Sequence, residues 1–74
     1  MQTFRIQVRY IVDNNQLGRY GWLIGKGPDL AIGNIYINER NATEYNVKDL
    51  EYILRQPAIG KKFVVVKIAD VNHK

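Results

Sequence analysis

Cysteine is absent from this chain of 74 residues, and histidine occurs only once. Without cysteine no disulfide can form, and one histidine cannot supply the usual cysteine and histidine ligands of a zinc site. A chain this short buries only about 60% of the surface that its unfolded form exposes, so its core is thin. We therefore expect residues 1–74 to form one domain that apolar packing stabilises, with neither a metal nor a cofactor.

Serine is also absent, and threonine occurs only at Thr3 and Thr43. Together with the lack of cysteine, this removes most of the nucleophiles that covalent enzymes use. The only histidine, His73, is the next-to-last residue, and a chain end that frays cannot hold a general base in place. We therefore expect that this protein is not an enzyme and that it has no catalytic residues.

Long hydrophobic runs are missing as well. No apolar stretch approaches the roughly 18 residues that a membrane-spanning helix needs. The segment from Met1 to Arg5 lacks the basic stretch followed by an apolar stretch that marks a signal peptide. We expect a cytoplasmic protein that is not secreted and that has no membrane partner.

The first part of the chain has the pattern of β-strands. Apolar and polar residues alternate over residues 3–12, which is typical of a half-buried antiparallel strand. Residues 13–16 are polar and include paired asparagines, which favours a hairpin turn. Further strands are predicted over residues 19–25 and 30–39, and the glycines at 18, 21, 25 and 33 indicate bulges or bends.

The second part of the chain predicts a helix and one more strand. Asn46 is suited to cap a helix from Val47 to about Gln56, where Pro57 stops it. The predicted core face of this helix is Val47, Leu50, Ile53 and Leu54. The last strand is predicted over residues 61–69. We expect its core face to be Val64, Val66 and Ile68, and its opposite face to be Phe63, Val65 and Lys67.

The order β-β-β-α-β predicts a small α+β domain of two layers, an antiparallel sheet with one helix packed on one face. The first three strands are expected to form a meander, and the last strand to return at an edge or beside the first strand. An SH3-like curled sheet, with the helix as a plug and the glycines at its corners, is the alternative. Residues 70–74 are expected to be a frayed tail.

Basic residues gather at both ends of the chain, which has a net charge of +4. Residues 1–26 contain four basic residues and one acidic residue, and residues 61–74 likewise contain four basic residues and one acidic residue. Residues 27–60 contain three basic residues and five acidic residues. If the two ends lie side by side, they form a basic patch next to an acidic middle segment. Such a patch suits phosphate or an acidic protein surface.

Basic residues also stand next to aromatic residues, which is the pattern of a nucleic-acid platform with stacking rings and phosphate-binding cations. In addition, three strands followed by a helix resemble, in the order of their elements, the small DNA-binding domains of the integrase arm-binding type. This resemblance implies that the sheet face with Arg5, Gln7 and Arg9 would meet DNA. A basic nucleic-acid-binding module is therefore one hypothesis for the function.

The other hypothesis is a protein-binding role. Phe63 and Val65 are predicted to lie off the core face of their strand, which would leave the sheet face without the helix partly apolar. Such a face, or an uncovered edge strand, suits a protein partner or a homodimer. We favour this reading, a small non-enzymatic inhibitor or adaptor of the kind that phage-type small proteins provide, because the excess of basic residues is modest.

Both hypotheses use the same candidate partner-binding residues, which combine cations with apolar or aromatic side chains. They are Arg5, Arg9, Arg19, Trp22, Lys26, Lys62, Phe63, Val65 and Lys67.

Overall fold

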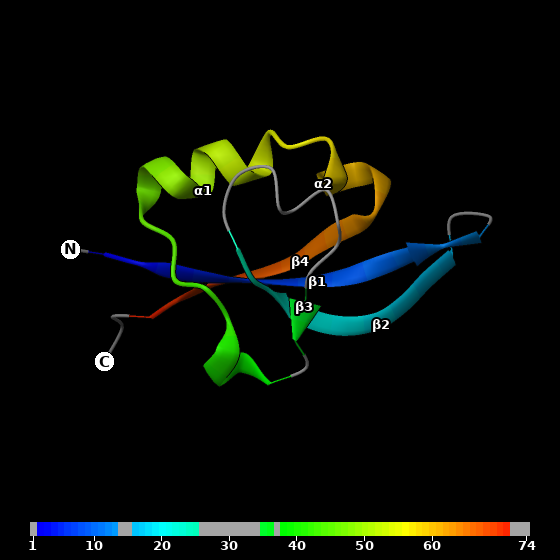
Figure 1. Cartoon of the computed structure of the whole chain (residues 1–74), viewed down its shortest axis with the longest axis horizontal. Helices are drawn as coiled ribbons and strands as arrows, with labels where there is room; N and C mark the ends of the chain where they lie inside the picture. Colours follow the sequence, from blue (N-terminus) through cyan, green and yellow to red (C-terminus); the bar gives the residue numbers. More distant parts are fainter. Residues whose placement is uncertain (1, 14–15, 26–34, 37, 72–74) are drawn as a thin grey trace.

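The computed structural model of the protein describes residues 2–13, 16–25, 35–36 and 38–71. Within them, four strands form one sheet of order β3-β2-β1-β4, and all three strand pairs are antiparallel. Helices α1 and α2 lie on the same side of this sheet (Figure 1). The elements are β1 (Phe4–Val12), β2 (Gln16–Leu23), β3 (Ile35–Tyr36), the 3-10 helix η3 (Glu39–Asn41), α1 (Val47–Leu54), α2 (Ala58–Lys61) and β4 (Phe63–Asp70).

This architecture confirms the predicted α+β fold. The first three strands form the expected meander, and β4 lies both beside β1 and at an edge of the sheet. Because β3 and β4 are the two ends of the strand order among the described residues, the sheet is open there. The two-layer arrangement is therefore observed in place of the SH3-like alternative.

Strand β1 is central, and its alternating pattern determines which side chains are buried. Ile6 and Val8 are fully buried. The intervening residues, Arg5, Gln7 and Arg9, lie on the opposite face, which we call the outer face. Pairing with β2 is irregular between Arg9 and Ile11, and this places a bulge next to Gly18, as the glycine pattern predicts.

Strand β4 contradicts the predicted assignment of its faces. Tyr10 pairs with Phe63 and Val8 with Val65, so Phe63 is fully buried and Val65 packs against the core. Val64 pairs with Arg9 on the outer face. The prediction that Phe63 and Val65 face away from the core is wrong, as is the prediction that Val64 faces it.

The physical reason is that residues 63–66 are apolar at every position, so alternation within β4 does not specify a face. The register with β1 decides instead. A bulge between Gln7 and Val8 adds one residue, Val66, to β4. After the bulge, Ile68 pairs with the buried Ile6 and yet stays 42% exposed.

The core lies between the sheet and α1, and Tyr45 contributes its largest side chain. Tyr45 follows η3 and is bonded to Phe4 in both directions, with N···O distances of 2.7 and 2.8 Å. Its hydroxyl donates to the carbonyl of Gly25 at 2.6 Å. Burial raises the pKa of Tyr45 to about 12.

Helix α1 begins where the sequence predicts. The Asn46 side chain accepts a hydrogen bond from the backbone N–H of Asp49 at 2.8 Å, which satisfies one of the free donors of the first turn. Ile53 is fully buried and Leu50 packs against the core. Val47 and Leu54 are exposed, so the predicted core face is correct for two of its four members.

The remaining differences concern the ends of elements. Strand β2 begins earlier than predicted, at Gln16. The third strand is predicted over residues 30–39, of which residues 30–34 and 37 lie outside the described residues. Asn38 is not part of a strand and precedes η3. At the end of the chain, Asp70 pairs with Phe4 and Val71 donates to the Thr3 carbonyl at 2.9 Å. Residues 72–74 of the expected tail lie outside the described residues.

Candidate functional site

Arg5, a candidate for partner binding, is engaged within the protein. Its Nη1 lies 3.1 Å from Glu39 Oε2, and its Nη2 lies 3.3 Å from Glu44 Oε2. Both carboxylates come from the acidic middle of the chain, which connects β3 to α1. The acidic segment thus neutralises Arg5 at one end of the outer face, and Arg5 contributes little positive charge for a partner there.

Arg9 is likewise occupied by contacts of its own chain. Its Nε donates to the Gly18 carbonyl at 2.9 Å and its Nη2 to the Leu17 carbonyl at 3.3 Å. The guanidinium carbon lies 4.6 Å from the ring centroid of Tyr20. Arg9 therefore satisfies carbonyls at the bulge of β2 and stacks on a neighbouring ring, which is a structural role.

The apolar and aromatic candidates are largely buried. Trp22 is 8% exposed, Phe63 is fully buried, and Val65 is only partly exposed. A ring in such a position offers no face on which a base could stack. Burial thus argues against Trp22 and Phe63 as direct contacts for a nucleic acid.

The remaining candidates are cations that lie on the surface. Arg19, Lys62 and Lys67 are exposed, whereas Lys26 lies outside the described residues. Arg19 is on β2 and Lys67 is on β4, and β1 lies between these two strands. The structure therefore does not gather the predicted basic residues into one cluster, but it places Lys62 and Lys67 on or next to β4.

Strand β4 carries the feature that the sequence analysis did not locate. The strand order ends at β4, so in the described part of the chain one side of β4 has no strand beside it. Val64, Val66 and Ile68 are 37%, 43% and 42% exposed, and Lys67 is exposed among them. We call Val64, Val66, Lys67 and Ile68 the β4 edge surface.

The limits of this surface are set by neighbouring elements. At the start of β4, Ile59 of α2 forms a parallel bridge with Phe63, so the uncovered edge begins at Val64. The short α2 can fold back in this way because Gly60 has φ of +97°, in the left-handed region that glycine adopts without strain. Among the described residues, no strand pairs with β4 on this side from there to the end of the strand.

The backbone of this edge is suited to pairing with another strand. The N–H of Val71 bonds to the Thr3 carbonyl, so the Thr3–Val71 pair is hydrogen-bonded. Hydrogen-bonded pairs alternate along an antiparallel ladder. The backbone groups of Ala69 and Lys67 therefore point to β1, and those of Ile68 point to the open side.

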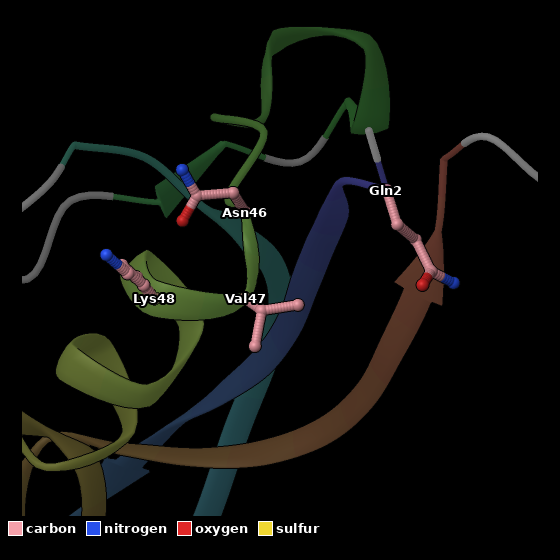
Figure 2. Close-up of a pocket in the computed structure, with 4 residues that line it drawn as sticks. All are labelled: Gln2, Asn46, Val47 and Lys48. Carbon is pink, nitrogen blue, oxygen red and sulfur yellow. The ribbon is translucent and has the colours of Figure 1, made fainter.

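A shallow pocket of about 390 Å³ lies close to the end of this edge, and Gln2, Asn46, Val47 and Lys48 line it (Figure 2). Val47 projects from the first turn of α1 toward the strands, while Lys48 extends away from them. Gln2 connects the pocket to β4, because its side-chain amide donates to the carboxylate of Asp70. The pocket thus provides an apolar recess beside the last residue of β4.

The signal for the β4 edge surface was present in the sequence. The segment from Phe63 to Ile68 contains five apolar residues and one lysine, which is more apolar surface than one face of a strand can bury. Alternation along the strand predicted that Phe63 and Val65 are the apolar residues off the core face. The structure assigns the surplus to Val64, Val66 and Ile68 instead.

Comparison with known proteins identifies no family for this chain. No protein-family model, curated protein or solved structure matches this chain. Among the described residues, no three side chains of the metal-binding types come together. Within the same residues, no helix has the length and apolar character needed to cross a membrane.

Proposed function

We propose that this protein is a small non-enzymatic protein-binding domain, an inhibitor or adaptor, that receives an extended segment of a partner protein as an additional strand along β4. The observation that carries the proposal is the open edge of β4 with its three exposed aliphatic side chains. An edge strand offers unpaired backbone donors and acceptors, and an extended segment of another protein can add to an open edge as a further strand.

The other hypothesis, nucleic-acid binding, is less well supported by the contacts of the arginines on the outer face. Arg5 is paired with two carboxylates, and Arg9 is bonded to its own backbone neighbours. Tyr20 is half exposed, but Arg9 stacks on its ring. A phosphate-binding surface needs cations that are available to the ligand. Two cations of the outer face, Arg5 and Arg9, already bind groups of their own chain.

Selection of peptides on the immobilised protein tests the proposal. A displayed library of random ten-residue peptides should yield binders. We expect Val66→Lys to weaken the selected peptides at least tenfold, because it removes an apolar side chain that would pack on the added strand and replaces it with a charged group that stays hydrated. Leu17→Lys on β2 is the matched control, since Leu17 is exposed to the same extent as Val66, 43%.

Two outcomes would overturn the proposal. One is a selection that yields no binder, and the other is an equal loss of affinity in both variants. A short single- or double-stranded oligonucleotide that binds at low salt, and is released steeply as salt rises, would favour the nucleic-acid hypothesis instead.

A further inference from the structure

We infer that the segment received by β4 is acidic, with an aspartate or glutamate opposite Lys67 and apolar residues at alternating positions around it. This inference rests on the proposed function and names the chemistry of the partner. It follows from the distribution of charge along the β4 edge surface.

Lys67 is the central charge of the edge. It is the only charged residue from Phe63 to Ala69, and its side chain is exposed. No ion pair joins Lys67 to any carboxylate of the described residues. A carboxylate directly opposite it on an added strand would form a favourable cross-strand pair.

The start of the edge is basic as well. Lys61 and Lys62 are exposed immediately before β4, at the point where α2 closes the edge. The one acidic residue of the strand, Asp70, lies at the far end, where the Gln2 side chain bonds to it. The uncovered edge therefore carries the positive charge of Lys67 at its middle, and the exposed Lys61 lies shortly before its start.

The direction of the added strand follows from the sheet. All pairs in this sheet are antiparallel, and antiparallel pairing is somewhat more stable for each residue. An antiparallel partner enters beside Asp70, then passes Lys67, and leaves the edge near Lys61. Its acidic residues are therefore expected at the centre and at the C-terminal end of the bound segment.

A second copy of this chain fits the edge less well. Antiparallel pairing of two β4 strands about the middle of the uncovered stretch, residues 64–70, places Lys67 opposite Lys67 of the other copy. Like charges directly opposite each other are destabilising, and each copy also has a net charge of +4. An acidic partner avoids both repulsions.

Three synthetic peptides test the inference. Each has nine residues of alternating valine and threonine with capped ends, and the central residue is glutamate, glutamine or lysine. By fluorescence anisotropy we expect the glutamate peptide to bind about twofold to fivefold more tightly than the glutamine peptide, and the lysine peptide to bind most weakly. Lys67→Glu should reverse this order, whereas Arg19→Glu, the same charge change on β2, should preserve it.

The outcomes separate the inference from the proposed function. Equal binding of the three peptides, or library binders without an excess of acidic residues, overturns the inference and leaves strand addition standing. Failure of both the peptides and the library overturns both. A dimer in sedimentation equilibrium that Val66→Lys dissociates would overturn the acidic partner in favour of a second copy.

Discussion

At the scale of single residues, Tyr45 illustrates how a small core accommodates a polar group. The ring is fully buried, and its hydroxyl donates to the Gly25 carbonyl at 2.6 Å. Loss of this bond leaves a carbonyl without its partner, which costs about 1–2 kcal/mol. The tyrosine thus links the segment before α1 to the end of β2, two parts of the chain that are 20 residues apart.

The raised pKa of Tyr45 predicts a loss of stability in alkali. The pKa is 10 in the unfolded chain and about 12 in the folded protein, so the unfolded state loses its proton first as the pH rises. The stabilisation is complete below pH 10 and is lost between pH 10 and about 12, by up to about 3 kcal/mol. Urea unfolding between pH 8 and 11.5 measures it.

The matched variants for this prediction are Tyr45→Phe and Tyr52→Phe. Tyr45→Phe should lower the free energy of unfolding by about 1–2 kcal/mol at pH 7 and should flatten its decline above pH 10. Tyr52 is half exposed on α1, and its replacement should leave the decline unchanged. A decline that is equally steep in Tyr45→Phe would show that another group causes it.

At the scale of elements, β1 and α1 could be predicted because their signals are local. The strict alternation of residues 4–10 defines one buried face, and Asn46 with Asp49 three residues later defines the start of a helix. The extent of helix burial could not be predicted as well. Val47 is 53% exposed, because α1 covers only part of the sheet and its first turn borders the pocket beside Gln2.

The faces of β4 and the partners of Arg5 could not be predicted, because both depend on contacts between distant parts of the chain. An apolar residue at every position from Phe63 to Val66 gives no alternation to read, so the face depends on a bulge opposite β1. The partners of Arg5, Glu39 and Glu44, are 34 and 39 residues away in the chain. Contacts of this range arise only from the complete fold.

The hairpin of β1 and β2 also gives a test at this scale. We expect Arg9→Lys to lower the free energy of unfolding by about 1–2 kcal/mol, because lysine keeps the charge but cannot bond to the Gly18 and Leu17 carbonyls together. Arg19→Lys on the exposed side of β2 should change it by less than about 0.5 kcal/mol. Equal effects in urea unfolding would contradict the structural role of Arg9.

At the scale of the whole molecule, the fold brings together charged residues that lie far apart in the sequence. The two basic ends of the chain do lie side by side, since β1 pairs with β4 along its length. The acidic middle then meets Arg5, so the positive charge that stays available shifts from β1 toward Lys67 on β4. This combination of an open apolar edge and an available cation is what a partner strand would recognise.

Amide hydrogen exchange, followed residue by residue by NMR, tests this account most directly. In the free protein, the amide of Ile68 should exchange rapidly, while those of Lys67 and Ala69 should be protected by their bonds to β1. With the glutamate peptide at saturation, exchange at Ile68 should slow at least tenfold. An Ile68 amide that is already protected in the free protein, or protection by the peptide that appears only away from β4, would contradict the account.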